Sequence, residues 1–217
     1  MEMTREDIAS NEACLIEEII RGRKELYEII IRKYNPYLYK IGRSYQYNHA
    51  DTEDLMQDTF IDAYRNLNQF RGRSSFKTWI TRIMLNNCYH QKRKSSYKNE
   101  IPRELYEESK PMYANTNDQT GRVVRSHELR HIVEEALMQL PLPYRMVFSL
   151  REMNQINVAE TASLLDISEA NVKVRLSRAK AMLREHIEKS YSPTDLFEFN
   201  LIHCDPMVER VMQEIKK

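Results

Sequence analysis

The stretch "VAETASLLDISEANVKVRLSRAKAML", Val158 to Leu183, decides how this sequence is interpreted. An apolar-patterned segment runs into the short break "DIS", and a second helical segment follows. Two helices joined by a three- or four-residue turn are typical of a helix-turn-helix. The second segment contains no acidic residue from Ala170 to Arg184. The sequence therefore predicts a helix-turn-helix whose second helix faces a polyanion.

The periodicity of this stretch separates an inner face from an outer face. Ser168 is placed to cap the second helix, which leaves the first residues of that helix free to face a groove. Lys and Arg read guanine edges or hold phosphates, and Asn pairs with adenine. A solvated basic face on an ordinary bundle helix is the alternative. The positions expected to point inward are Val158, Ala162, Leu165, Ile167, Val172, Leu176 and Ala179. Those expected to point outward are Glu169, Asn171, Lys173, Val174, Ser177 and Arg178.

The composition favours an all-α protein and gives no sign of a small-molecule site. The 217 residues include only 4 Gly and 7 Pro, and no glycine-rich phosphate loop occurs. The net charge of +1 says nothing about partners, so only the distribution of charge is informative. Cys14, Cys88 and Cys204 form no CxxC pair, which suits a reducing compartment. We expect a soluble cytoplasmic protein that inserts into no membrane, binds no metal and needs no cofactor.

The charge changes sign along the first half of the chain. The segment "HADTEDLMQDTFIDAYRNLNQF" predicts an amphipathic helix whose first half is acidic. From Arg71 to Lys98 no acid occurs, and "SSFKTWITRIMLNNCYHQKRK" predicts a basic helix entered through a Ser cap. Earlier helices are expected over Glu12 to Tyr47, with a break at Gly22 and a new helix starting near Pro36.

The middle of the chain lacks periodicity and divides it into parts. The stretch from Ser95 to Gly121 is polar and contains Pro102 and Pro111, which indicates a flexible linker. We predict a first helical domain over residues 1–96, a linker over 97–122 and a helix-turn-helix domain over 123–190. The tail, residues 191–217, has no predicted role.

Two long segments resemble one protein family. The segment "ADTEDLMQDTFIDAYRNLNQFRGRSSFKTWITRIMLNN" is similar to region 2 of the sigma-70 family of RNA polymerase specificity subunits. The segment "ALMQLPLPYRMVFSLREMNQINVAETASLLDISEANVKVRLSRAKAML" looks like region 4 of that family. Their order, the linker and the absence of room for a middle domain match the small extracytoplasmic-function branch. The resemblance implies a non-enzymatic promoter-specificity factor. Its implied partners are the β′ and β subunits of core RNA polymerase, promoter DNA and an anti-sigma factor.

The resemblance also implies three sets of site residues. By this resemblance, the residues that contact the polymerase are Asp51, Glu53, Asp54, Leu55, Gln57, Asp58 and Phe60. The residues that bind the melted −10 element are Arg71, Arg73, Phe76, Lys77, Trp79, Arg82, Asn86 and Asn87. The residues that contact the −35 duplex are Asn171, Lys173, Val174, Arg175, Ser177, Arg178 and Lys180. In the second set, cations suit the backbone, flat rings suit stacking and amides suit base edges.

One position departs from the family pattern. Relatives usually carry Asp four residues after the residue matching Asn86, whereas this chain has His90. The change puts local salt bridges and the −10 preference in doubt.

Other classes of function explain less of the sequence. A conventional helix-turn-helix regulator shares the second half, but it leaves the acidic-to-basic inversion between Asp51 and Lys98 without an explanation. An enzyme would need a nucleophile–base pair, a metal spacing or a phosphate loop, and none is evident. A helical scaffold leaves both basic helices without a purpose.

Overall fold

The computed structural model describes residues 11–98 and 131–190, together with Val208, Met212 and Ile215. Every regular element of the described residues is helical, which confirms the all-α prediction. The first half contains α2 (Glu12–Ile20), η1 (Lys24–Leu26), α3 (Tyr27–Ser44), α4 (His49–Arg65), η2 (Leu67–Gln69) and α5 (Phe76–Lys98). The second half contains a helix over 131–139, α7 (Leu142–Phe148), η3 (Ser149–Met153), α8 (Val158–Leu165) and α9 (Glu169–Ser190).

Helices α3, α4 and α5 pack on one another and form the core of the first half. Gly42 of α3 lies where the three helices meet. A Cβ atom at this position would lie 2.6 Å from Thr52 Cγ2 and 3.2 Å from Met84 Cε. The missing side chain of Gly42 therefore sets how closely α4 and α5 approach α3.

Helix α3 runs without interruption through Pro36, so the prediction that a helix starts near this residue is wrong. Proline removes one backbone donor from a helix. The buried stripe of Ile30, Tyr34, Leu38 and Ile41 continues across Pro36. Burial of this stripe against the core holds the helix together where local propensity alone predicts a break.

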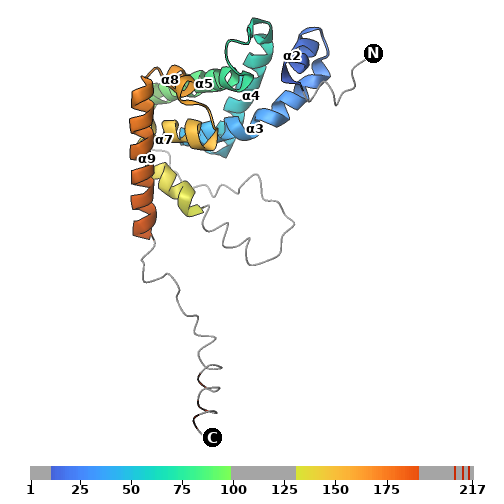
Figure 1. Cartoon of the computed structure of the whole chain (residues 1–217). Helices are drawn as coiled ribbons and strands as arrows, with labels where there is room; N and C mark the ends of the chain where they lie inside the picture. Colours follow the sequence, from blue (N-terminus) through green and yellow to red (C-terminus); the bar gives the residue numbers. More distant parts are fainter. Residues whose placement is uncertain (1–10, 99–130, 191–207, 209–211, 213–214, 216–217) are drawn as a thin grey trace.

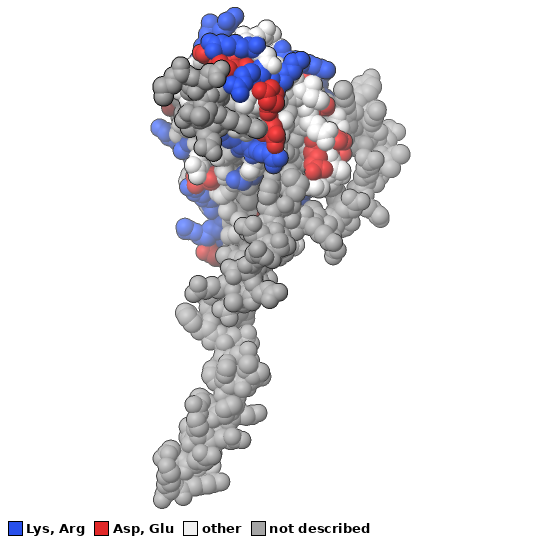
Figure 2. Space-filling view, turned by 90° about the vertical axis from the view of Figure 1, so that its right-hand side faces the viewer, with Lys and Arg blue, Asp and Glu red and all other residues white. Residues whose placement is uncertain are grey.

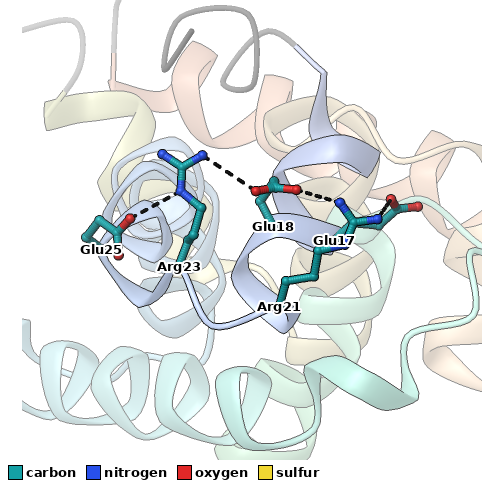
Figure 3. A network of polar contacts seen from close by, with 5 residues as sticks. All are labelled: Glu17, Glu18, Arg21, Arg23 and Glu25. Carbon is teal, nitrogen blue, oxygen red and sulfur yellow. Dashed lines mark hydrogen bonds and ion pairs between the residues drawn. The ribbon is translucent and has the colours of Figure 1, made fainter. Parts of the chain in front are cut away.

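The turn after α2 is fixed by glycine geometry and is surrounded by ion pairs. Gly22 has a φ of +113°, which confirms the predicted break. Arg21 lies 2.7 Å from Glu18 and 3.6 Å from Glu17 in a network of exposed charges that Figure 3 shows from close by. Arg23 extends this network to Glu18 and Glu25, at 3.5 and 3.4 Å.

Helices α8 and α9 form the predicted helix-turn-helix. Ala162 and Val172 are buried together, and Asp166 adopts the left-handed conformation, with a φ of +52°, at the end of α8. The Asn171 N–H donates to Ser168 Oγ at 3.2 Å, which confirms the predicted cap. A further element was not predicted: α7 continues into η3, which is a π-helix. Such widened turns are rare and often lie at functional sites.

The two halves share one apolar core. Met146, Leu150 and Ile156 of the second half belong to the same buried cluster as the core of α3, α4 and α5. Helices α7 and η3 pack on α3, and α8 packs on α5, as Figure 1 shows. The predicted linker lies outside the described residues from 99 onward, as does nearly all of the tail. Across the described ranges we find no helix that is both long and apolar enough to cross a membrane.

Candidate nucleic-acid interface

Helix α9 presents its predicted outer face to solvent. Val172 and Ala179 are completely buried, at 0% exposure, and these two residues fix the rotation of the helix. Val174 on the opposite side is 47% exposed. The predicted outward residues Glu169, Lys173, Ser177 and Arg178 are also exposed. The basic face of α9 is therefore accessible along the first three turns of the helix.

Three of the residues predicted to read the −35 duplex are engaged within the protein. Arg175 Nε donates to Asn171 Oδ1 at 3.0 Å, so these two side chains hold each other along α9. Lys180 forms an ion pair of 2.9 Å with Glu152 of η3. This ion pair links α9 to the preceding element and gives Lys180 a structural contact in addition to its predicted one.

Helix α5 carries an exposed stripe that the sequence analysis only partly identified. Arg82, Asn86, Tyr89 and Arg93 follow one another at spacings of three and four residues, so they share one face. Tyr89 is 55% exposed, and the Arg93 guanidinium lies 5.8 Å from the centre of its ring. Tyr89 was missed, although an aromatic residue one turn after Asn86 in an acid-free helix is a recognisable signal. Arg71 and Arg73 are exposed in the loop before α5.

The aromatic residues at the start of α5 form part of the core. Phe76 is 1% exposed, and its ring centre lies 5.3 Å from those of Tyr34, Phe70 and Trp79. A base has no access to this ring, so the prediction that Phe76 contacts DNA is corrected: Phe76 supports α5 from inside. Trp79 is half-buried and packs against the same core.

The two neighbouring amides of α5 point in different directions. Asn86 is exposed. Asn87 is half-buried, and its Nδ2 donates to Thr59 Oγ1 and Asp62 Oδ2, each at 3.3 Å. Asn87 therefore ties α5 to α4, whereas Asn86 faces outward and is free to meet a base.

Two cations of α5 are hydrogen-bonded to the second half of the chain. Lys77 Nζ donates to the Asn154 carbonyl and lies 3.8 Å from the centre of the Tyr37 ring. Burial and nearby Lys40 lower the pKa of Lys77, and Glu160 opposes this shift. Arg82 Nη2 donates to Ser163 Oγ at 2.9 Å. The charged side of α5 is thus partly occupied in this structure.

The acidic side of α4 borders an apolar hollow. Asp54, Gln57 and Asp58 are exposed, whereas Asp51 and Glu53 are half-buried. The hollow, of about 360 Å³, lies between α3 and α4 and is lined by Ile31, Asn35, Glu53, Met56, Gln57, Phe60 and Ile61. Ile61 is 47% exposed beside it. The sequence analysis found the acidic residues and Phe60 but missed the hollow, because its far wall comes from α3.

Leu55 does not belong to this surface. Its side chain is 6% exposed and lies in the core between the helices of the first half. The prediction that Leu55 contacts the polymerase is therefore corrected: it is a core residue.

Charge on the face that carries α2 is mixed. Figure 2 looks at the side of the molecule that carries α2, where Lys and Arg gather at the upper end with Asp and Glu among them. No group of three or more His, Cys, Asp or Glu side chains that could hold a metal ion occurs within residues 11–98 and 131–190.

Comparison with known families matches both halves of the chain. The family description "Sigma-70 region 2" matches residues 30–97, and "Sigma-70, region 4" matches residues 130–183. The first match covers α3 to α5, and the second covers the helix-turn-helix. The two matches appear in the order that the sequence analysis expected.

Similar proteins are bacterial factors of nearly the same length. The chain is 29% identical to the "ECF RNA polymerase sigma-E factor" of Escherichia coli strain K12 over 82% of this chain and 93% of that protein. It is 25% identical to the factor of the same name from Haemophilus influenzae, over 80% and 94%.

Two solved structures share the fold. One is CnrH in complex with the cytosolic domain of CnrY, with a TM-score of 0.59, 22% identity, and 82% of this chain and 97% of that chain covered. The other is the sigma factor RpoE of Bartonella quintana in complex with the anti-sigma factor NepR, with a TM-score of 0.56, 23% identity, and 70% and 91% covered.

Proposed function

The chain belongs to the extracytoplasmic-function branch of the sigma-70 family, and we propose that it directs core RNA polymerase to specific promoters and assists DNA melting there. One observation carries the proposal. A single chain presents an exposed basic recognition helix, α9, and a second basic helix, α5, whose outer face combines Arg82, Asn86 and Tyr89. The first suits duplex DNA and the second suits single-stranded DNA.

Helix α9 reads the −35 element from the major groove, which is wide enough to admit an α-helix. Lys173 and Arg178 supply donors for guanine edges or phosphates, and Ser177 supplies a hydroxyl. Val174 offers an apolar surface to a thymine methyl group. Asn171, Arg175 and Lys180 complete this set, with Arg175 and Lys180 nearer to the phosphates.

Helix α5 holds the −10 element after its bases leave the stack. Arg71, Arg73, Lys77 and Arg82 neutralise the backbone of the single strand. Asn86 meets a base edge, and the exposed ring of Tyr89 adds a stacking surface next to it. The half-buried Trp79 contributes the exposed part of its side chain, and Asn87 keeps α5 in place on α4. This activity is binding alone, so the chain performs no catalysis and needs no cofactor.

The hollow on α4 receives the β′ subunit of the polymerase. Glu53, Gln57 and Phe60 line it, and Asp51, Asp54 and Asp58 add negative charge on the same helix. An acidic rim around an apolar centre is suited to a basic partner with an apolar anchor. With these partners, the proposed site of action is the bacterial cytoplasm. An anti-sigma factor is a further partner, in line with the anti-sigma factor named with the Bartonella structure.

Reconstitution tests this function. The purified chain is mixed with bacterial core polymerase, followed by gel filtration and then transcription from fragments of the source genome. Co-elution with specific new start sites is expected. The variant Asp58→Lys reverses charge beside the hollow and is expected to weaken co-elution, whereas Lys189→Ala at the far end of α9 leaves it unchanged. Duplex binding without polymerase association would instead favour a conventional regulator.

A further inference from the structure

The hollow between α3 and α4 is followed, one helical turn further along each helix, by a contact between two side chains. Asn35 of α3 and Glu53 of α4 line the hollow. Tyr39 lies four residues after Asn35, and His49 lies four residues before Glu53. Residues four apart on a helix are neighbours on one face, so both residues are placed next to the lining of the hollow.

Tyr39, His49 and Glu53 form a continuous row of contacts that ends at the hollow. Tyr39 Oη lies 3.2 Å from His49 Nδ1, and the two rings meet edge to face with their centres 5.7 Å apart. On the other side of the imidazole, His49 Nε2 lies 3.5 Å from Glu53 Oε1. A neutral imidazole that accepts from a tyrosine hydroxyl carries its hydrogen on the other nitrogen. The contact with Tyr39 therefore directs the ring hydrogen of His49 towards Glu53.

A second pair with the same spacing is held differently. His131 Nδ1 lies 3.3 Å from Glu135 Oε1, and the two side chains are 65% and 67% exposed. The side chains of His49 and Glu53 are 36% and 45% exposed. The ring of His131 is paired along its own helix, whereas the ring of His49 joins two helices. The contact with Tyr39 thus distinguishes His49 from an ordinary surface histidine.

The charge of His49 determines the net charge beside the hollow. When the ring is neutral, the carboxylate of Glu53 is an uncompensated negative charge, and when the ring is protonated, the pair is neutral overall. A protonated ring donates from both nitrogens, and the Tyr39 hydroxyl is able to accept as well as to donate. The same three side chains therefore stay in contact in both states, and protonation changes the charge without breaking the row.

Groups on α4 itself act on His49 in opposite directions. Glu53 favours the protonated ring, and Asp51, two residues further along, does so from a longer range. His49 is the first residue of α4, and the N-terminus of a helix disfavours a cation.

Helices α3 and α5 pack on α4 and contribute few groups near this ring. From α3, Tyr39 supplies its hydroxyl, and Arg43, one turn further along, adds a positive charge that opposes protonation. Helix α5 bonds to α4 at Thr59 and Asp62, almost three turns away from His49 or more. The hydroxyl of Tyr39 is thus the group that holds the ring from another helix.

We propose that His49 is a positioning residue for polymerase docking: held by Tyr39, its neutral ring orients Glu53 as a full negative charge at the hollow, and its protonation weakens docking. This inference rests on the proposed function, which assigns the hollow to a basic partner. A cation of the partner beside Glu53 competes with the proton on His49, so binding favours the neutral ring. Imidazoles change charge between about pH 5 and pH 8, so the affinity for polymerase is lower at pH 6 than at pH 8.

The affinity of the full chain for immobilised core polymerase, measured at pH 6, 7 and 8 and constant ionic strength, tests this role. His49→Gln is neutral at every pH and keeps a side-chain N–H for Glu53, so we expect it to retain most of its pH 8 affinity at pH 6. We expect the wild-type chain to bind roughly two- to fivefold more weakly than His49→Gln at pH 6, the range of one exposed charge pair. Comparing the two chains on the same polymerase cancels the titration of the polymerase itself.

Two further variants separate charge from structure. His49→Lys places a permanent cation beside Glu53 and is expected to bind weakly at every pH. His131→Gln is the matched control, because it removes a histidine with the same spacing to a glutamate, and it is expected to follow the wild-type profile. Circular dichroism of each variant checks that its helices remain folded.

Nitrogen-15 NMR of the free chain tests the orientation of the ring directly. The signals of His49 are identified as those that His49→Gln lacks. At pH 8 we expect its hydrogen on Nε2 in the wild-type chain, and a mixture of both tautomers in Tyr39→Phe. A wild-type ring with its hydrogen on Nδ1 would contradict orientation by Tyr39.

The outcomes distinguish this role from the proposed function. An equal loss of affinity at pH 6 in the wild-type chain and His49→Gln would overturn the role of His49 and leave polymerase docking intact. Equal binding by His49→Lys and His49→Gln would have the same meaning. If the wild-type chain and its variants all fail to bind polymerase at every pH, the proposed function is refuted, and the role of His49 in docking with it.

Discussion

Helices α5 and α9 are both basic and acid-free, yet the structure leaves them in different states. The outer residues of α9 are exposed, and Val174 is 47% accessible. On α5, Lys77 and Arg82 are bonded to the other half of the chain, and Phe76 is buried. Charge alone therefore does not reveal whether a helix is ready to bind. What its side chains already contact decides that.

The largest expected difference in stability is between substitutions of two aromatic residues of α5, Phe76 and Tyr89. Phe76→Ala removes a ring that is 1% exposed and packed against three others, so we expect the free energy of unfolding to fall by about 3–5 kcal/mol. Tyr89→Ala removes a ring that is 55% exposed, and we expect a change within about 0.5 kcal/mol. Urea denaturation followed by circular dichroism measures both. Equal losses would contradict the division into an inner and an outer aromatic residue.

The second prediction concerns DNA binding by the exposed face of α9. Arg178→Ala removes an exposed cation from the outer face of α9, and we expect the free chain to lose about 1–3 kcal/mol of affinity for its −35 duplex. Lys189→Ala, at the end of the same helix, is the matched control and is expected to have little effect. Fluorescence anisotropy with labelled duplex, repeated over a range of salt, gives the affinity and the number of phosphate contacts. If both variants bind equally weakly, α9 is a general basic face and not a reading helix.

The sequence was most informative where one local pattern determined the structure. The helix-turn-helix, the Ser caps of α5 and α9 and the break at Gly22 depend on nearby residues, and all were predicted. The cap of α5 is Ser75, whose Oγ accepts from the Thr78 N–H at 3.1 Å. Pro36 was misread because the burial that keeps α3 continuous comes from partners far along the chain. Long-range packing overrides local preference in such cases.

In the candidate site, too, local patterns were predictable and contacts between distant elements were not. Most of the outward face of α9 was predicted from its regular period, but Asn171, also expected to point outward, is half-buried and bonded to Arg175. Phe76 and Leu55 were assigned to binding because their chemistry fits, but only the packing of several helices shows that they are buried. The hollow beside α4 and the covering of α5 each need elements that are distant in sequence. No single stretch contains that information.

Alkaline pH is expected to weaken the first half of the chain. Burial raises the pKa of the Cys88 thiol from 9.0 to about 12, and burial and nearby Cys88 raise that of Tyr45 from 10.0 to about 12. Burial also raises the pKa of Tyr27, Tyr34 and Tyr47. The folded state thus keeps protons that the unfolded state releases, so stability is complete below pH 9.0 and falls as the pH rises towards 12.

The expected slope is on the order of 1 kcal/mol per pH unit for a fully buried group such as Cys88. Urea denaturation at pH 7, 9 and 10, followed by the fluorescence of Trp79, reports on this half because the chain has 1 Trp. Cys88→Ala is expected to reduce the slope. Stability that stays constant through pH 10 would show that these groups are accessible to water.

The smallest expected loss of stability comes from removing an exposed ion pair. Arg21 and Glu17 are 67% and 66% exposed in the network around the α2 turn, so Arg21→Gln is expected to cost less than about 1 kcal/mol, and less still in high salt. The neighbouring Gly22→Ala is the informative comparison. Its φ of +113° is unfavourable for any side chain although no atom lies within 4 Å of the added Cβ, so we expect this change to cost more. Thermal unfolding of both variants decides the order, and a larger loss from Arg21→Gln would mean that the ion pairs, and not the backbone, hold this turn.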